Sequence, residues 1–190
     1  MTCIPTDGEP RLLRGRPAET KTPREDRCYD LLDRLDISYD RVDHAPADTI
    51  ALCHQVETVL GCPICKNLLL TNRQQTDFYL LLLPGDKVFK TKYLSKALGC
   101  SRLSFATGEQ MEALLDTAPG SLSVLGLGND SEQRVRLVID SPVLEGPQIG
   151  CHPCKNTSTL RFSTRDLLDK LLPALGRTPV IVALPTEDTP

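Results

Sequence analysis

The sequence has no run of about 18 consecutive apolar residues, the minimum for a helix that crosses a membrane. Its first twenty residues, MTCIPTDGEPRLLRGRPAET, also lack the continuous apolar segment of a secretory signal peptide. We therefore expect a cytoplasmic protein that does not associate with membranes. The sequence also has no excess of positive charge, since its net charge is −3. This balance argues against a protein that coats nucleic acid indiscriminately.

The length and composition fit a single globular domain. The chain has 190 residues, of which 40% are apolar and 25% charged, so a sizeable core can form. Residues 1–21 mix proline, glycine, threonine and both charges without a period, which predicts a flexible tail. We expect the domain to span residues 22–185, with a second short tail at 186–190.

Hydrophobic periodicity predicts helices and strands that interleave along the chain. A first helix begins at the capping sequence TPRE, residues 22–25, and a second can be capped by Asp48 or Thr49 and ended by Gly61. Strands are predicted at 37–44, 65–71, 77–83, 102–106, 134–140, 156–162 and 179–184. Further helices are predicted at 90–99, 108–115 and 165–176, the last capped by Ser163 or Thr164.

Two dense apolar strands, CKNLLLT and DFYLLLL, are separated only by NRQQT, which is typical of a hairpin. Their continuous apolar runs indicate strands that are covered on both faces. Because a hairpin is antiparallel, the sheet cannot be purely parallel. The sequence therefore predicts an α/β (α+β) fold with a mixed, curved β-sheet and helices packed around it.

Eight cysteines are present, and in a reducing compartment they are expected to be thiols, metal ligands or catalytic groups rather than disulfides. Cys62 with Cys65, and Cys151 with Cys154, form two Cys-x-x-Cys pairs that could together bind zinc. The long separation between the pairs is unlike a compact zinc finger. A redox pair and buried thiols that act as small hydrophobic residues are the other interpretations.

Positive charge is concentrated in one segment. Between Asp86 and Arg102 the chain has four lysines and an arginine but a single acidic residue. Such a run is usually the solvated face of a helix, yet it is also the best local candidate for contact with phosphate groups.

Several blocks of the sequence resemble the YbaK/aminoacyl-tRNA editing family, and in particular its freestanding prolyl-tRNA deacylases. The blocks are CKNLLLTNRQQTDFYLLLLPGDK, RLSFAT, PGSLSVLGLGNDSEQRVRLVID and GCHPCKNTSTLRFSTRDLLDKLL, and the likeness runs from about Arg24 to Leu184. The resemblance implies hydrolysis of alanine that is wrongly attached to proline tRNA, with no metal and no other cofactor. This chain has Val124 where many relatives have a proline.

The resemblance places the family's motif lysine on Lys66, its glycine-led loop on Gly120 and its histidine-proline turn on His152. A lysine can hold a phosphate or a carbonyl oxygen, and the bare backbone near a glycine can offer N–H groups to an oxyanion. Each residue also has a plainer interpretation, namely a surface lysine, a turn glycine or a histidine satisfied by backbone. The candidate substrate-binding residues are Ser121, Leu122, Ser123, Gly126, Asn129, Asp130, Asn156 and Thr157, with Asp130 as a partner for the substrate ammonium group.

The sequence thus predicts a trans-editing deacylase that acts on the acceptor end of tRNA(Pro), with alanine as the expected amino acid. Prolyl-tRNA synthetase is a further candidate partner. A non-catalytic regulator that binds an amino acid or charged tRNA, and a deacylase for Cys-tRNA(Pro) or Ser-tRNA, remain as alternatives.

Overall fold

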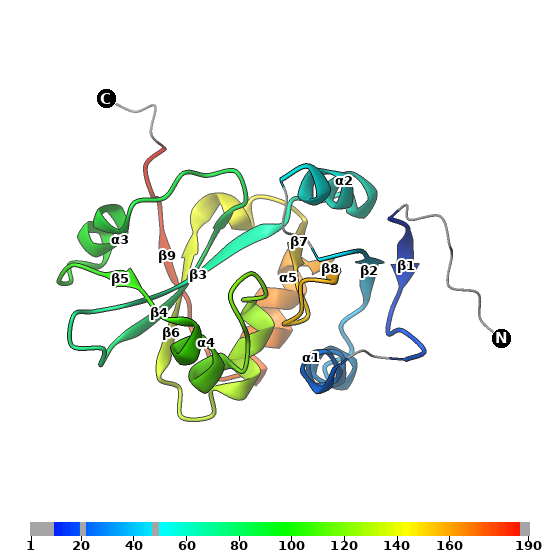
Figure 1. Ribbon diagram of the computed structural model, residues 1–190, viewed down its shortest axis with the longest axis horizontal. Coiled ribbons are helices and arrows are strands. Elements are labelled where there is room, and N and C mark those ends of the chain that lie inside the picture. The colour runs from blue at the N-terminus through cyan, green and yellow to red at the C-terminus, as the bar shows by residue number, and fades with distance from the viewer. Residues whose placement is uncertain (1–9, 20–21, 47–49, 187–190) are drawn as a thin grey trace.

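The computed structural model describes residues 10–19, 22–46 and 50–186, and Figure 1 shows how its helices and strands follow one another. The strands are β1 (Leu12–Arg14), β2 (Tyr39–Asp43), β3 (Cys65–Thr71), β4 (Phe78–Pro84), β5 (Ser104–Phe105), β6 (Val135–Asp140), β7 (Gln148–Cys151), β8 (Ser158–Ser163) and β9 (Val180–Val182). The helices are α1 (Pro23–Arg34), α2 (Ile50–Leu60), α3 (Thr91–Leu98), α4 (Gly108–Leu115), α5 (Thr164–Asp166) and α6 (Leu172–Ala174), together with the 3-10 helices η1 (Val124–Asn129) and η2 (Ser141–Leu144) and the π-helical turn η3 (Leu167–Leu171).

The strands form two sheets rather than one. The four-stranded sheet has the order β1-β2-β8-β7 and is antiparallel throughout. The five-stranded sheet has the order β5-β3-β4-β6-β9, with antiparallel pairs around β3 and parallel pairs around β6. The mixed α/β class predicted from the sequence is confirmed, and its mixed sheet corresponds to the five-stranded one.

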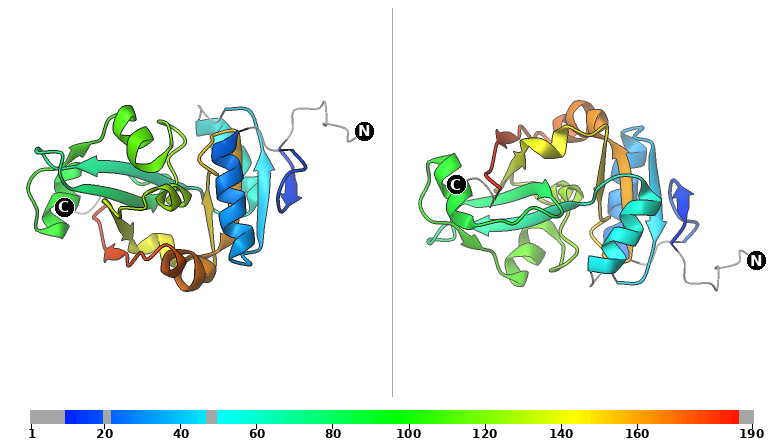
Figure 2. Two further views of the ribbon diagram at one scale, coloured as in Figure 1. Left: turned by 90° about the horizontal axis from the view of Figure 1, so that it is seen from below. Right: turned by 90° about the horizontal axis from the view of Figure 1, so that it is seen from above.

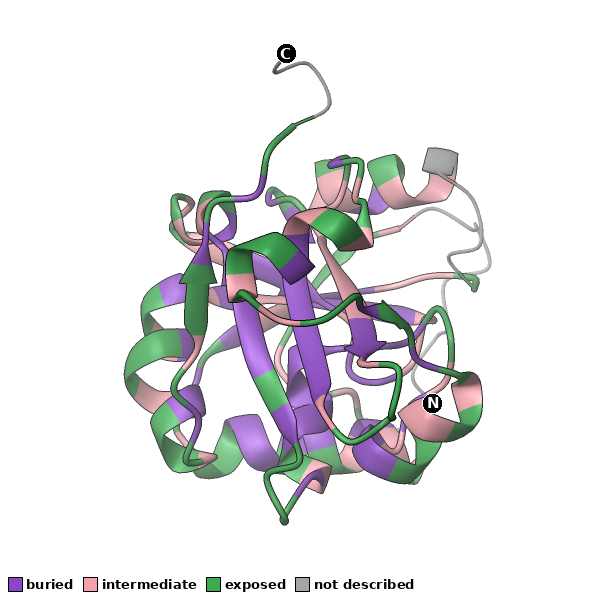
Figure 3. Ribbon diagram, turned by 90° about the vertical axis from the view of Figure 1, so that its left-hand side faces the viewer, coloured by how far each residue is buried: buried purple, intermediate pink, exposed green. Residues whose placement is uncertain are grey.

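The hairpin of β3 and β4 forms the centre of the five-stranded sheet, in register from Cys65 opposite Pro84 to Thr71 opposite Phe78. Figure 3 shows the buried middle of this sheet, and Leu80, Leu81 and Leu82 of β4 are all fully buried. Because neighbouring side chains point to opposite faces of a strand, both faces must be covered. The continuous apolar runs are therefore explained by packing on both sides.

The main core lies between the two sheets. It contains Leu69, Leu80 and Leu82 from the five-stranded sheet, and Leu160 and Phe162 from the four-stranded sheet. Figure 2 shows α1 lying along the four-stranded sheet, and residues of α1 and η1 complete this core. A second cluster on the other face of the five-stranded sheet packs against α3, and a third packs α2 against β2.

The N-terminal part of the domain differs from the prediction at one place. Residues 12–14 lie in the segment that the sequence assigns to a flexible tail, but they form β1 and pair with β2. All three side chains are exposed, so the strand has no hydrophobic pattern that could reveal it. The first helix begins as predicted, with the Thr22 hydroxyl accepting a hydrogen bond from the Glu25 N–H. The predicted caps Asp48 and Thr49 lie outside the described residues.

The last predicted helix, 165–176, is interrupted in its middle. Ser163 caps it as expected, but α5 passes into the π-helical turn Leu167–Leu171 before α6. Pro173 sits in α6 and has no N–H to donate to the preceding turn. A π-helical turn just before a proline is one way in which a helix accommodates the lost hydrogen bond.

No helix in the described part of the chain combines the length and apolar character needed to cross a membrane.

Candidate functional site

The two sheets meet where the chain enters β3. Ile64 forms an isolated parallel bridge with Gly150 of β7, and Figure 1 shows the start of β3 beside β7. A side chain at position 150 would place its Cβ only 2.7 Å from the Pro63 carbonyl oxygen, so a glycine is needed for this close approach. Two residues after the bridge, one segment reaches Lys66 and the other reaches His152.

His152 lies outside the main core, on the face of the four-stranded sheet that also carries Thr159. Its Nδ1 is 2.9 Å from the Ser158 carbonyl oxygen and 3.3 Å from the Thr159 hydroxyl. The ring of His44 lies beside it with 6.1 Å between centroids, and His44 Nε2 is 2.8 Å from the same hydroxyl. Burial lowers the pKa of His152 and the nearby His44 lowers it further, so the imidazole is neutral at pH 7.

This buried imidazole predicts a pH-dependent stability. Above pH about 6.5 a histidine is neutral in both the folded and the unfolded chain. Below that pH the unfolded chain takes up the proton first, because the pKa of His152 is lowered in the folded state. The free energy of unfolding should therefore fall as the pH is lowered from 7 to 5. His152→Gln should remove part of that fall. Urea denaturation at several pH values measures the free energy of unfolding of each variant. The control is His54→Gln, which replaces an exposed histidine. Equal pH dependence in both variants would contradict the prediction.

Gly120 lies next to the turn that follows His152. It has a left-handed backbone, with φ of +80°, and its nearest side-chain neighbour at the Cβ position is Asn156 Nδ2 at 3.9 Å. Gly120 is exposed, and within the described chain its N–H donates to no protein acceptor, whereas the next N–H, of Ser121, donates to the Ala118 carbonyl. An accessible, unoccupied backbone N–H is the kind of donor that stabilises an oxyanion.

Lys66 is half-buried at the beginning of β3. Its Nζ donates a hydrogen bond of 2.8 Å to the Lys87 carbonyl oxygen. Cys65 and Leu69 face the main core, so alternation along the strand turns Lys66 to the opposite face. Lys66 and His152 thus both point away from the main core, each from its own sheet.

The predicted substrate-binding residues that follow Gly120 are buried instead. Ser123 caps η1 by accepting a hydrogen bond from the Leu125 N–H, and Leu122 packs in the main core. Gly126 has Leu115 and Cys154 directly against it. Together with the buried Ser121, these residues shape the segment rather than present groups to a ligand. We therefore leave Ser121, Leu122, Ser123 and Gly126 out of the proposed site.

The structure gives Asp130 a structural role. Its carboxylate accepts hydrogen bonds from the Arg134 and Val135 N–H groups and pairs with Arg177 at 3.0 Å, and both ionic side chains are buried. No oxygen of this carboxylate is directed to the surface near Gly120, so it is not available to a substrate ammonium group. Asn129 likewise donates from Nδ2 to the Leu115 carbonyl at 3.0 Å.

Asn129→Ala should therefore affect stability rather than catalysis. The variant loses one partly buried hydrogen bond, which is typically worth about 1 kcal/mol. We expect thermal or urea denaturation to show a loss of this size, with kcat and KM for a charged tRNA unchanged. An increase in KM without a loss of stability would instead return Asn129 to the binding site.

The four cysteines of the two pairs do not form a metal site. Among the described residues, no three His, Cys, Asp or Glu side chains are grouped as metal ligands. Burial raises the pKa of Cys62 to about 11 and that of Cys65 to about 12, so neither is a thiolate at neutral pH. Cys151 and Cys154 are buried in the main core. These positions fit the interpretation as buried or half-buried thiols that act as small hydrophobic residues.

Two polar atoms near the junction are buried without a hydrogen-bond partner. They are Oδ1 of Asn67, next to Lys66, and the hydroxyl oxygen of Thr157, next to Asn156. Buried polar groups are nearly always paired, so unpaired ones point to a missing partner such as a ligand. The position of His44 beside His152 was not predicted, because it depends on a contact between distant segments that no local pattern reveals.

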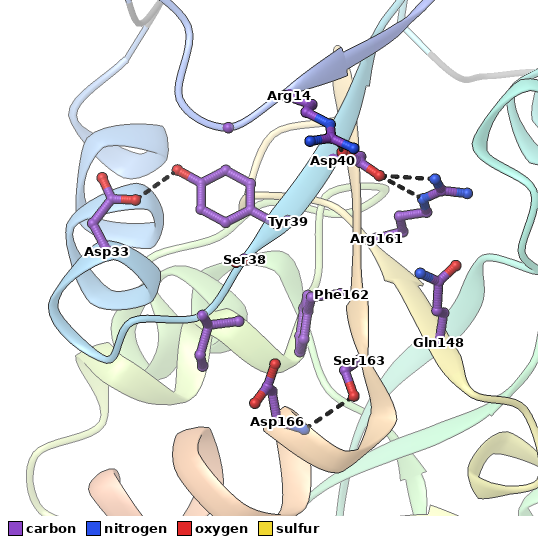
Figure 4. Close-up of a pocket in the computed structure, with 12 residues that line it drawn as sticks. Arg14, Asp33, Ser38, Tyr39, Asp40, Gln148, Arg161, Phe162, Ser163 and Asp166 are labelled. Carbon is purple, nitrogen blue, oxygen red and sulfur yellow. Dashed lines mark hydrogen bonds and ion pairs between the residues drawn. The ribbon is translucent and has the colours of Figure 1, made fainter.

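A cavity of about 620 Å³ lies elsewhere, beside the outer strands of the four-stranded sheet. Figure 4 shows that several of its polar groups contact one another, as in the 2.8 Å contact between Asp40 and Arg161 and the 2.9 Å hydrogen bond from Tyr39 to Asp33. None of the residues predicted from the sequence line it. We therefore do not assign the reaction to this cavity.

Comparison with known proteins gives a consistent result. Residues 44–170 match the family described as the aminoacyl-tRNA editing domain. The chain is 30% identical over 147 residues to the prolyl-tRNA editing protein ProX of Acetoanaerobium sticklandii, covering 77% of this chain and 89% of the relative. It is 31% identical over 121 residues to prolyl-tRNA synthetase associated domain-containing protein 1 of Mus musculus, covering 62% and 70%.

Solved structures share the fold. A protein described as a candidate trans-editing enzyme for prolyl-tRNA synthetase superposes with a TM-score of 0.65 at 17% identity, covering 87% of this chain and 98% of that one. The hypothetical protein APE2540 superposes with a TM-score of 0.64 at 18% identity, covering 83% and 98%.

Proposed function

Because the chain belongs to the aminoacyl-tRNA editing domain family, we propose that it hydrolyses the ester bond of mischarged tRNA(Pro), with alanine as the amino acid released. Membership of this family makes the chain a deacylase. One of the two relatives is named as a prolyl-tRNA editing protein, and the other as a prolyl-tRNA synthetase associated protein. The observation that supports the proposal is that the Ile64–Gly150 bridge joins the segment leading to Lys66 with the segment leading to His152, while Asn156 of the following turn lies against Gly120.

In this proposal the reaction needs no covalent intermediate. A water molecule attacks the ester carbonyl, the carbon–oxygen bond to the ribose breaks, and the products are the free amino acid and a tRNA with its terminal hydroxyl restored. An aminoacyl ester is already activated, so placement and electrostatic stabilisation can supply most of the acceleration. The Gly120 N–H is assigned to the oxyanion, and the Lys66 ammonium to the carbonyl or to the terminal phosphate.

His152 and the residues around it are assigned to the substrate. A neutral imidazole whose Nδ1 is held by the Ser158 carbonyl leaves Nε2 as its acceptor, which suits the α-amino group of the bound amino acid. Asn156 and Thr157 are assigned to the terminal adenosine, since Asn156 lies against Gly120 and the Thr157 hydroxyl has no partner in the protein.

The choice of alanine follows from size. A synthetase pocket shaped for proline cannot strongly exclude a smaller amino acid, because each missing methylene is worth only about 1–3 kcal/mol. A second site that admits alanine and excludes proline supplies the missing discrimination. We propose that the protein does this in the cytoplasm, on tRNA released by prolyl-tRNA synthetase.

The test is a deacylation panel with Ala-, Cys-, Ser- and Pro-tRNA(Pro). We expect rapid release of alanine, slower release of the larger serine and cysteine, and release of proline at the rate in buffer. Saturable binding of all four without turnover would reject the catalytic proposal in favour of a regulatory binding protein.

A further inference from the structure

The exposed surface of α3 and β5 carries a group of positively charged side chains. Lys90, Lys92, Lys96 and Arg102 are all exposed, and with the exposed Phe105 we call them the α3 basic surface. Lys90, Lys92 and Arg102 line a cavity of about 570 Å³ together with Thr91 and Ser95, and no acidic residue lines it.

Lys92, Lys96 and Arg102 have no acidic partner among the described residues, unlike other basic residues of the chain. Arg16, Arg24 and Arg161 each pair with carboxylates on neighbouring segments. In the described chain, by contrast, no carboxylate lies within 4.0 Å of the charged groups of Lys92, Lys96 or Arg102, and Lys92 contacts only the ring of Tyr93, at 5.1 Å. Lys92 and Lys96 are one helical turn apart, an arrangement of like charges that slightly destabilises a helix. In a protein of net charge −3, this local excess indicates an anionic partner.

An aromatic side chain stands among these cations. Phe105 is 57% exposed, although it is a large apolar residue, and its ring packs edge-on against Phe89 with 6.3 Å between centroids. Phe89 directly precedes Lys90, and Phe105 follows Arg102 by three residues, so the exposed ring and the basic residues share one surface. Unpaired bases of RNA stack on exposed aromatic rings while basic groups hold the backbone phosphates.

This surface is connected directly to the proposed site. Lys66 donates to the carbonyl of Lys87, and Lys90 is three residues further along the chain. A fully extended chain spans at most about 3.6 Å per residue, so the Cα of Lys90 lies within about 11 Å of that of Lys87. The α3 basic surface thus begins three residues after the carbonyl that receives Lys66, and we expect a strand whose terminal ester is held at Lys66 to run toward it.

We propose that the α3 basic surface binds the acceptor arm of the tRNA, with Lys92, Lys96 and Arg102 on backbone phosphates and Phe105 stacked on an unpaired base near the 3′ end. This inference rests on the proposed function, because it takes the substrate to be a charged tRNA. Charge complementarity favours RNA over a protein partner, since the surface combines clustered cations with a single exposed ring.

The test removes the charge without touching the proposed catalytic residues. The triple variant Lys92→Gln, Lys96→Gln, Arg102→Gln is compared with Arg14→Gln, Arg34→Gln, Arg165→Gln, which removes three exposed positive charges elsewhere. We expect the first variant to raise KM for Ala-tRNA(Pro) about tenfold or more with kcat within about twofold. The slope of log(kcat/KM) against log salt should become shallower by about 2–3, because each phosphate contact contributes roughly 0.7–0.9.

Stacking is tested separately by binding of uncharged tRNA(Pro), which needs no turnover. Phe105→Leu should weaken binding about tenfold, and Phe105→Tyr should retain it, since only the aromatic face is required.

If wild-type protein releases no alanine, the proposed function fails. If wild-type protein is active but the α3 variant matches the control in KM and salt slope, only this inference fails. Unchanged tRNA binding together with lost capture of prolyl-tRNA synthetase would overturn it in favour of a protein partner.

Discussion

Lys66→Ala should slow the release of alanine from Ala-tRNA(Pro) by about 10²–10³, the typical effect of removing one group that stabilises the transition state of acyl transfer. Lys66 is half-buried at the sheet junction, and its ammonium group is held by the Lys87 carbonyl at 2.8 Å. A cation that is fixed in this way needs little reorganisation when negative charge develops on a nearby oxygen. The measurement is single-turnover deacylation, which separates chemistry from product release.

Lys170→Ala is a matched control for this substitution. Its Nζ also donates to a backbone carbonyl, that of Asp36, at 2.7 Å, but it lies on the π-helical turn far along the chain from the junction. Both variants remove a lysine that is bonded to backbone, so a general effect on stability should be similar. We expect the deacylation rate to fall only for Lys66→Ala. Equal rates in the two variants would remove Lys66 from the catalytic assignment.

The fold could be predicted well wherever the information is local. The limits of β3 and of α4 agree with the sequence analysis residue for residue, because a hairpin of apolar strands and a capping box are local signals. Two strands, β7 and β1, were not predicted from the sequence, because they lack such local signals. The strand β7 is short, contains Gly150 and follows a proline, and β1 exposes all three of its side chains, so both depend on pairing with distant strands.

The candidate site stays a prediction. Motif blocks singled out Lys66, Gly120 and His152, and the Ile64–Gly150 bridge joins the segments that lead to Lys66 and to His152. Two of the residues predicted to bind the substrate, because they follow Gly120 in the sequence, make structural contacts instead. Ser123 and Asp130 follow Gly120 closely but are used for capping and for a buried ion pair. A loop that must approach a ligand at one residue has to be anchored at others, and sequence alone does not separate the two roles.

Lys87 shows how such an anchor supports the site. Its side chain is 7% exposed and its Nζ lies 2.6 Å from Asp140 Oδ2 and 2.6 Å from the Leu184 carbonyl. The other oxygen of Asp140 accepts the Leu184 N–H at 2.9 Å. The buried pair thus fixes the segment between β4 and α3 to β6 and to the end of the chain's last strand. It also fixes the Lys87 carbonyl that receives Lys66.

Lys87→Met should therefore lower the free energy of unfolding by about 3–5 kcal/mol, because it leaves the fully buried Asp140 carboxylate without its cation. The double variant Lys87→Met, Asp140→Asn should recover part of this loss, since the amide carries no charge and its oxygen can still accept the Leu184 N–H. Urea denaturation measures both. Lys170→Met is the control: it breaks a partly exposed pair with Asp166, and should cost less than about 1 kcal/mol.

Lys87→Met also distinguishes the structural role of Lys87 from its effect on the deacylation rate. Under conditions where Lys87→Met is still folded, deacylation should be slower than in the wild type, because the carbonyl that positions Lys66 is no longer held. The double variant should regain stability but not the full rate, since neither new side chain restores the contact with the Leu184 carbonyl. If Lys87→Met is no less stable than Lys170→Met, the buried pair does not hold this segment, and Lys66 must be positioned by another contact.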